Sequence, residues 1–439
     1  MANFYKPPAK KKIDKKHQEY AVTKLDHLGN GIAFIDNKPV FIEGALPNET
    51  VLAQLTESKK YVAKAQLMKV LSPSEHRVTP FCSHYKDCGG CNLQHLAQHE
   101  QIEQKKQILQ ELMIRATSIN NLVQQPPITG KSTQYRRRTR LSAKVSKQGK
   151  LELGFRKRAS KNIINVDHCP VLNQQLDAVL AQLHPLLTSL KGMRILGHVE
   201  LSTSNAGNLL FVRTIKHLHT KDKEALKQFA TNLNLILFIK QADDEAELLV
   251  GSLPYYELDE LKLYYQPQNF LQINEEINKK MVSQAIDWLE IEPTDKVLDL
   301  FCGLGNFSLP LAKRAKHVIG VEGVANMVEQ ANQNAKLNAL SNVEFFCANL
   351  ELPISNTDWG QQQYQKILLD PARAGAFEVM EYLAKSKADR ILYVSCNPAT
   401  LARDSQILLK KGYKLDKLGL LDMFPNTGHL EAMALFTKA

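Results

Sequence analysis

The first part of the chain alternates short apolar stretches with turn residues. Residues 1–16 are rich in lysine and lack hydrophobic periodicity, but stretches such as Gly31–Ile35, Val40–Ile42 and Val51–Leu55 then follow one another at short intervals. Several short strands in a row, separated by turn residues, are typical of a small β-barrel. The pattern therefore predicts a flexible basic tail over residues 1–16 and a β-barrel over residues 17–73.

The middle of the chain mixes helical and strand-like patterns. A long helical pattern runs over residues 92–116, whereas residues 138–145 and 195–201 are strand-like. Strands and helices that do not alternate regularly are typical of an α+β domain. We predict such a domain over residues 74–92 and 127–265.

From about Gln266 onwards, apolar strands and amphipathic helices alternate regularly. This βα order implies a parallel sheet with crossover helices. We therefore predict an α/β fold in which residues 266–439, together with residues 93–126, form a Rossmann-like domain. The OB-like barrel and the α+β domain precede it.

The composition excludes a membrane protein. Of the 439 residues, 44% are hydrophobic and 23% are charged. No apolar run approaches the roughly 20 residues that span a bilayer, and the N-terminus lacks the apolar segment of a signal peptide. We expect a cytoplasmic monomer without a membrane partner.

The charge favours a polyanionic partner. The formal net charge is +11, from 56 Lys and Arg against 45 Asp and Glu, and the excess is concentrated in residues 1–16, 135–140 and 156–158. Such clusters attract the phosphates of nucleic acids by releasing counterions. For the N-terminal lysines alone, a solvated tail is an equally good interpretation.

A glycine-rich turn follows an apolar strand at Asp299–Phe307. Gly303 and Gly305 let the backbone approach a ligand closely because no Cβ intervenes. The next strand ends in Glu322, at a spacing that suits an acceptor for two ribose hydroxyls, and the strand after it leads to Asn349, placed to meet an adenine edge. The third glycine of a dinucleotide motif is missing, so the loop favours a nucleoside cofactor over a pyrophosphate.

Two later strands also end in residues that can do chemistry. Asp370 ends one strand, and Cys396 ends another just before Pro398, where a helix begins. Open α/β sheets bind substrates at such strand ends. A thiol is intrinsically nucleophilic, and a helix N-terminus favours the thiolate, so Cys396 is the candidate nucleophile. We predict that Cys302 and Cys347 are instead buried small hydrophobes.

Three segments resemble the motifs of the RNA uracil-5-methyltransferases. They are Asp370–Gly375 (Asp-Pro-Ala-Arg-Ala-Gly), Tyr393–Thr400 (Tyr-Val-Ser-Cys-Asn-Pro-Ala-Thr) and Asp422–Glu431 (Asp-Met-Phe-Pro-Asn-Thr-Gly-His-Leu-Glu). The resemblance extends over residues 266–439. One departure is Asn426, where His, Gln or Tyr is expected. The predicted barrel resembles the TRAM module, an OB-like RNA-binding domain, although a purely structural β-domain is the alternative.

The resemblance implies methyl transfer from S-adenosylmethionine to C5 of a uracil. Uracil C5 is a poor nucleophile, and attack of the Cys396 thiolate on C6 activates it; the resemblance makes Glu431 the base that then removes the C5 proton. Because C6 is inaccessible in a stacked helix, we expect the base to be flipped out or presented from a loop. The cofactor contacts implied by the resemblance are Gln272, Phe301, Asn306, Glu322, Asn349 and Asp370.

Four of the seven cysteines have the spacing of a metal site. Cys82, Cys88 and Cys91 lie close together, and Cys169 precedes a proline far downstream. Zinc sites usually show two Cys-x2-Cys halves, and only one is present, so zinc is the alternative. The spacing resembles the iron–sulfur motif of the bacterial ribosomal-RNA members of the family, which implies a structural [4Fe-4S] cluster.

The TRAM-like barrel and the four cysteines, which we expect to be absent from transfer-RNA members, resemble the bacterial 23S ribosomal-RNA branch of the family. The resemblance implies 23S rRNA as the partner and uracil 1939 as the target. Two alternatives stay open. One is the same chemistry on another rRNA site or on tRNA, and the other is a non-catalytic iron–sulfur protein that binds RNA.

Overall fold

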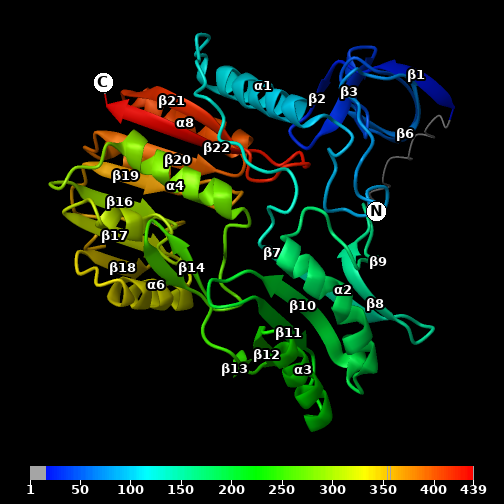
Figure 1. The fold of residues 1–439 in the computed structure, drawn as a ribbon. Helices are drawn as coiled ribbons and strands as arrows, with labels where there is room; N and C mark the ends of the chain where they lie inside the picture. The colour runs from blue at the N-terminus through cyan, green and yellow to red at the C-terminus, as the bar shows by residue number, and fades with distance from the viewer. Residues whose placement is uncertain (1–15, 353, 356, 439) are drawn as a thin grey trace, which may run out of the picture. The chain divides into compact units, whose positions relative to one another are not determined.

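A computed structural model describes residues 16–352, 354–355 and 357–438 (Figure 1). The predicted N-terminal tail therefore lies outside the described residues, apart from Lys16. The described chain forms two compact units. The first unit comprises residues 16–80, 92–104 and 426–429, and the second unit holds the rest. No helix among the described residues is long and apolar enough to cross a membrane.

The first unit contains a six-stranded sheet. In sheet order its strands are β1 (His17–Ala21), β5 (Thr50–Ser58), β6 (Ala63–Ser72), β4 (Lys38–Glu43), β3 (Asn30–Ile35) and β2 (Lys24–Leu25). Only β4 and β6 pair in parallel. Alternate residues such as Val40 and Ile42 point into a core with Tyr20 and Val51. β1 also contacts β3, so the sheet curls, and the short strands predicted here are confirmed.

The second unit begins with a mixed seven-stranded sheet, which we call the central sheet. In order its strands are β13 (Glu247–Val250), β12 (Ile236–Gln241), β11 (Leu209–Thr214), β10 (Leu196–Ser202), β7 (Arg138–Val145), β8 (Leu151–Arg156) and β9 (Ile163–Asn165). Its apolar face packs against α2 (Gln174–Ser189) and α3 (Thr220–Asn232), and a 3-10 turn, η1 (Met193–Ile195), leads into β10.

The second unit also holds a C-terminal sheet of Rossmann-like topology. In order its strands are β18 (Val343–Cys347), β17 (His317–Glu322), β16 (Lys296–Leu300), β19 (Lys366–Leu369), β20 (Arg390–Ser395), β22 (Glu431–Lys438) and β21 (Tyr413–Leu421). The first five are mutually parallel, and β22 pairs antiparallel with both of its neighbours.

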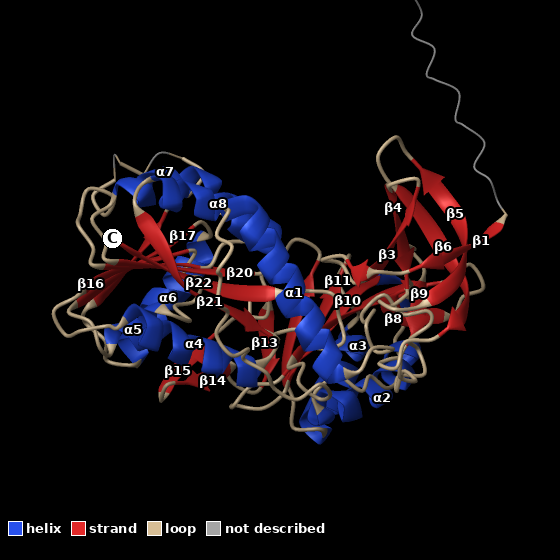
Figure 2. Ribbon diagram, turned by 90° about the horizontal axis from the view of Figure 1, so that it is seen from above, coloured by secondary structure: helices blue, strands red, loops and turns tan. Residues whose placement is uncertain are grey.

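Helices cover both faces of the C-terminal sheet (Figure 2). One face carries α4 (Glu275–Leu289), α5 (Ser308–Ala312) and α6 (Ala325–Leu337), and the other carries α7 (Phe377–Lys385) and α8 (Pro398–Lys410). A hairpin of β14 (Tyr255–Leu258) and β15 (Leu261–Tyr264) precedes α4. From β16 the strand order continues through β17 toward one edge of the sheet, whereas from β19 it continues through β20 toward the opposite edge. The carboxyl ends of β16 and β19 therefore flank a crevice, which is where ligands bind in such sheets.

The helix predicted over residues 92–116 begins later than expected. Helix α1 runs from Gln98 to Thr117. Before it, the amides of Asn92 and Leu93 donate to the carbonyl of Asn426 at 3.1 and 2.9 Å, and His95 accepts from the amide of Val78. Because these backbone groups bond elsewhere in the first unit, the segment cannot join the helix.

Candidate active site

The glycine-rich loop after β16 has an unusual backbone. Phe301, Gly303 and Gly305 all have positive φ, at 63°, 57° and 90°. A Cβ on Gly305 would lie 2.9 Å from the side chain of Leu309, so glycine is required there on two grounds. Glu322 accepts from the amide of Gly303 at 3.1 Å and thereby fixes the loop.

The predicted cofactor residues lie around the carboxyl edge of the C-terminal sheet. Glu322 ends β17, Asn349 follows β18 and Asp370 follows β19. Gln272 reaches the same edge from the segment before α4, and its amide lies 3.5 Å from the Asp370 carboxylate. The structure thus brings residues from four separate segments to one edge.

Asn306 is held by two residues that sequence reasoning missed. Its side-chain oxygen accepts from the hydroxyl of Tyr256 and from the amide of Asn278, both at 3.0 Å, and its side-chain nitrogen donates back to Asn278 at 2.9 Å. Asn278 is a polar residue on the buried face of α4. That break in the apolar pattern was the available signal; Tyr256 gave none.

Cys396 and Glu431 lie at paired ends of two neighbouring strands. Ser395, the last residue of β20, is the register partner of Ala432 on β22. Cys396 follows Ser395 and Glu431 precedes Ala432, so the thiol and the carboxyl group reach the same point of the sheet edge. Glu431 is buried, and its Oε2 has no hydrogen-bond partner.

The electrostatics of this edge favour neutral groups. Burial raises the pKa of Glu431 to about 8 and that of Asp370 to about 7. Burial also raises the pKa of Cys396 to about 11, with further contributions from Glu431 and Asp370. The expectation that the helix dipole favours the Cys396 thiolate is therefore wrong for the ligand-free protein: desolvation and two nearby carboxyl groups outweigh it.

Two further cysteines test the prediction of burial. Cys302 is buried, and its pKa is raised by burial, so the prediction is confirmed. Cys347 is exposed, so the prediction is wrong there. The reason is its position as the last residue of β18, which is an edge strand of the sheet.

Helix α1 anchors the segment that leads to Glu431. The ammonium of Lys105 is buried and donates to Asp422 at 2.8 Å and to the carbonyl of Phe424 at 3.1 Å. Removing one partner of such a pair leaves an uncompensated buried charge.

In the first unit, Asn426 has a φ of 64°, a conformation that asparagine tolerates better than most residues. This explains how asparagine fits where the family pattern differs.

The buried carboxyl groups predict a stability that falls with rising pH. Asp299, buried below the glycine-rich loop, has its pKa raised to about 8 by burial, as Glu431 has. The folded state therefore binds more protons than the unfolded chain between roughly pH 4 and 8, so stability is lost as pH rises through this window. We expect a loss on the order of a few kcal/mol between pH 5 and 8, measured by urea denaturation.

The matched variant for this prediction is Glu431→Gln, which cannot titrate. Its stability should fall less over the same range than that of the wild type. If the stability of both proteins fell equally between pH 5 and 8, Glu431 would not hold a proton in the folded state.

The four candidate metal ligands belong to the second unit and face one another. Burial raises the pKa of Cys169 to about 12, and the Cys91 and Cys82 thiols add to the shift. Within the described chain, no three of these sulfurs lie within 4.8 Å of one another. A single tetrahedral zinc ion would hold its sulfurs roughly 3.8 Å apart. The sulfurs therefore lie further apart than a single tetrahedral zinc ion requires.

Protein contacts already hold the cysteine loop against the central sheet. The amide of Gly89 donates to the carbonyl of Arg156 at 3.1 Å. The guanidinium of Arg158 donates to the carbonyls of Cys88, Tyr85 and Cys91, at 2.6–3.2 Å. The guanidinium of Arg158, one of the basic residues 156–158, therefore supports this loop, and the predicted phosphate contact of this cluster stays a prediction.

The basic segment 135–140 divides between the interior and the surface, because successive strand residues point to opposite faces. Arg137 is 2% exposed, stacks on Tyr256 and donates to the carbonyl of Gln272 at 2.6 Å. Arg138 and Arg140 flank Glu200 from the same face, at 2.9 and 3.4 Å. Only part of the predicted cluster is thus available to a partner.

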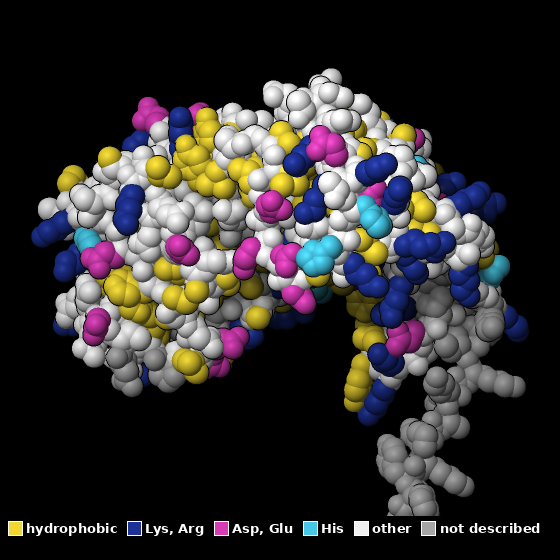
Figure 3. Space-filling model, turned by 90° about the horizontal axis from the view of Figure 1, so that it is seen from below, with side chains coloured by type: hydrophobic (Ala, Val, Ile, Leu, Met, Phe, Trp, Pro, Cys, Tyr) yellow, Lys and Arg dark blue, Asp and Glu magenta, His cyan; other side chains and the backbone are white. Residues whose placement is uncertain are grey.

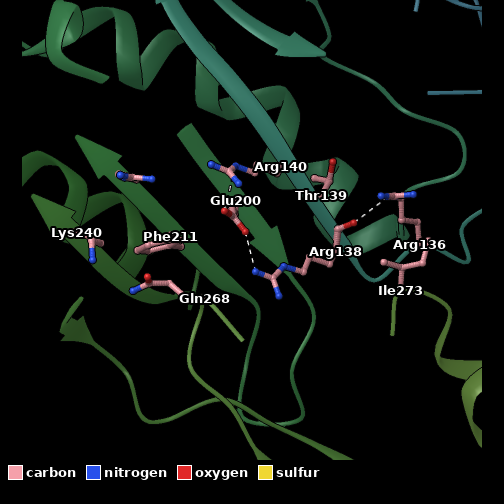
Figure 4. A pocket seen from close by; sticks show the side chains of 10 residues that line it. Arg136, Arg138, Thr139, Arg140, Glu200, Phe211, Lys240, Gln268 and Ile273 are labelled. Carbon is pink, nitrogen blue, oxygen red and sulfur yellow. Dashed lines mark hydrogen bonds and ion pairs between the residues drawn. The ribbon is translucent and has the colours of Figure 1, made fainter. Parts of the chain in front are cut away.

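A pocket of about 410 Å³ opens beside Glu200 (Figure 4). Arg140, with 52% of its side chain exposed, lies at this pocket together with Arg213 and Lys240. Figure 3 shows that Lys and Arg side chains gather toward one side of the face that it draws. The pocket itself is lined by several basic side chains.

Comparisons with known proteins agree on one family. The family model described as tRNA (Uracil-5-)-methyltransferase matches residues 97–439, and the TRAM domain model matches residues 16–68. A protein of Aliivibrio fischeri (strain ATCC 700601 / ES114), named 23S rRNA (uracil(1939)-C(5))-methyltransferase RlmD, is 52% identical over 440 residues, which cover 100% of both chains. A protein of the same name from Vibrio cholerae serotype O1 (strain M66-2) is 49% identical over 439 residues, again 100% of both chains.

A solved structure shares the fold. Pyrococcus abyssi tRNA (uracil-54, C5)-methyltransferase, in complex with S-adenosyl-L-homocysteine, has a TM-score of 0.75 and 22% sequence identity, covering 96% of this chain and 100% of that chain. At this identity the likeness extends to the fold alone.

Proposed function

Because the chain belongs to the tRNA (uracil-5-)-methyltransferase family, we propose that it forms 5-methyluridine in 23S rRNA, at uracil 1939, with S-adenosylmethionine as methyl donor. The observation that carries the chemistry is the pairing of β20 with β22, which brings Cys396 and Glu431 to one point of the sheet edge. The choice of 23S rRNA as the substrate rests on the relatives that match over their full length. We further propose that it acts as a cytoplasmic monomer.

The residues at the sheet edge fit a nucleoside cofactor. The positive φ angles of Gly303 and Gly305 keep the loop backbone open to a ligand, and Glu322 presents carboxylate oxygens that suit ribose hydroxyls. We assign Gln272, Phe301, Asn306, Glu322, Asn349 and Asp370 to cofactor binding. S-adenosylmethionine, when bound, supplies an electrophilic methyl group and one positive charge.

Cys396 and Glu431 then have separate tasks. The thiolate of Cys396 attacks C6 of the uracil, so that electron density at C5 can take the methyl group. The carboxylate of Glu431 removes the C5 proton, the C5–C6 double bond forms again and the C6–sulfur bond breaks. A positive charge at this edge would lower the pKa of Asp370, Glu431 and Cys396 and would thereby favour the thiolate form of Cys396.

We propose a [4Fe-4S] cluster on Cys82, Cys88, Cys91 and Cys169. The wide spacing of the sulfurs supports a cluster over a single zinc ion. The methyl transfer has no redox step, so the cluster is structural. Iron and sulfide analysis of anaerobically purified protein, with zinc measured in the same sample, tests this assignment.

The pocket beside Glu200 supports a role in RNA binding. Replacing Arg140 with alanine should weaken binding of the rRNA several-fold and reduce the salt slope of log K by about 1, because one phosphate contact is lost. The measurement is a binding titration at several salt concentrations. Lys221→Ala removes a charge from the exposed side of α3 and is the control. Equal losses in both variants would indicate only a general charge effect.

The test of the proposed function is covalent trapping. Fluorine cannot leave C5 as a proton does, so RNA that contains 5-fluorouridine should stay bound to Cys396 on a denaturing gel when S-adenosylmethionine is present. A 23S rRNA fragment, the same fragment with cytidine at position 1939 and a tRNA are compared. An adduct with the first RNA alone supports the proposal, an adduct with tRNA redirects it to a tRNA target, and no adduct overturns it.

A further inference from the structure

One group of potential metal ligands lies in the first unit. The side chains of His76, His99 and Glu100 bring their ligand atoms within 4.8 Å of one another. The Nε2 atom of His76 lies 3.7 Å from the Glu100 carboxylate, and the two imidazole rings meet edge to face with centroids 5.4 Å apart. Two imidazoles and a carboxylate are ligand types that zinc accepts.

The group is assembled from two segments that backbone bonds hold together. His76 belongs to the turn after β6, and the other two residues belong to the first turn of α1. The amide of Ala97 donates to the carbonyl of His76 at 2.9 Å, and Arg77 bridges to Leu96. The backbone positions of the three side chains are therefore fixed without any metal.

The carboxylate is also oriented. Gln104, one turn further along α1, donates to Oε1 of Glu100 at 2.8 Å, while Oε2 faces His76. A second group that orients a ligand in this way is a regular feature of metal sites. The carboxylate of Glu75, 3.6 Å from Nε2 of His76, lies within reach as a further oxygen ligand.

We infer that His76, His99 and Glu100 form a binding site for a divalent transition metal ion, with zinc as the expected occupant. Ligand atoms around a tetrahedral zinc ion lie roughly 3.3–3.5 Å apart. The present separations reach this value through side-chain movements on the order of 1 Å. The ion would close the junction between the six-stranded sheet and α1, which makes the role structural.

The four cysteines are the proposed ligands of a separate metal cluster, so the test must separate the two sites. We would load the full-length, untagged protein with Co²⁺, and load a His76→Asn/His99→Asn variant in the same way. Both proteins keep the cysteines, so the difference between them reports the histidine site alone. We expect the wild type to bind one more equivalent, with a difference spectrum of d–d bands and no sulfur-to-cobalt charge-transfer band. Zinc should compete for that equivalent.

Two further variants complete the experiment. His27→Asn, which removes an exposed histidine of the same unit, should bind as much metal as the wild type. Glu100→Gln should bind the ion more weakly while leaving the metal-free unfolding midpoint unchanged. Equal cobalt content in the wild type and the double variant would overturn the inference and leave direct contacts of His76 with the neighbouring carboxylates as the explanation. A sulfur-to-cobalt band in the difference spectrum would also overturn it.

Discussion

Replacement of Cys396 with alanine is expected to abolish methyl transfer while leaving RNA binding intact. Without the sulfur, C6 of the uracil is not attacked and C5 stays too weakly nucleophilic to take a methyl group. The rate should fall by at least about 10⁴-fold, the scale on which loss of a nucleophile acts. Cys396 lies at the end of β20 and not in the basic pocket, so the affinity for the rRNA fragment should change less than twofold.

The measurements are methyl incorporation from labelled S-adenosylmethionine and an RNA titration on the same protein preparation. Cys347→Ala is the matched control, because it removes an exposed thiol at the end of another strand of the same sheet and should retain wild-type activity. Substantial methylation by the Cys396 variant would rule out the covalent mechanism. A parallel loss of RNA binding would point to misfolding, and circular dichroism would separate the two.

Replacement of Glu431 with glutamine is expected to trap methylated RNA on the protein. After transfer, C5 carries both the new methyl group and its original proton, and the C6–sulfur bond breaks only when a base removes that proton. Glutamine has the same size but cannot accept it. Turnover should fall by about 10²–10⁴-fold, while labelled methyl accumulates in a covalent protein–RNA band even with ordinary uridine.

The pH dependence gives a second readout for this variant. A base acts in its ionised form, so breakdown of the adduct in the wild type should accelerate as pH rises through the pKa of Glu431, which is about 8 in the ligand-free protein. A bound cation shifts this rise in the rate of adduct breakdown to lower pH. The Glu431→Gln variant should show no such rise. The double variant Cys396→Ala/Glu431→Gln must show no adduct; an adduct there would mean that another residue forms the bond.

The sequence predicts where each strand ends better than it predicts which strands pair and which strand ends therefore lie together. Buried parallel strands appear as apolar runs, so residues such as Asp370 and Cys396 stand out where each run stops. The meeting of Cys396 with Glu431, however, depends on β22 inserting between β20 and β21, a long-range pairing that local pattern does not encode. Resemblance to a family, and not periodicity, pointed to Glu431 in advance.

Charge was the least reliable guide. A run of arginines suggests a surface patch, but Arg137, just before β7, is buried, whereas Arg140 within β7 is exposed. Arg158 and Lys105 likewise bond within the fold. A long basic side chain can serve either role, and the choice depends on carbonyls and carboxylates supplied by distant segments. The roles of the catalytic, cofactor-binding and metal-binding residues stay predictions, and so does the division into domains.

The surroundings of Cys396 also affect how readily its thiol is oxidised. Peroxide and related oxidants attack thiolates and leave protonated thiols largely untouched. With its pKa raised to about 11, the sulfur is almost entirely protonated between turnovers, so it resists conversion to sulfenic acid. Burial beside two carboxyl groups therefore protects the nucleophile from oxidation for as long as the thiol stays protonated.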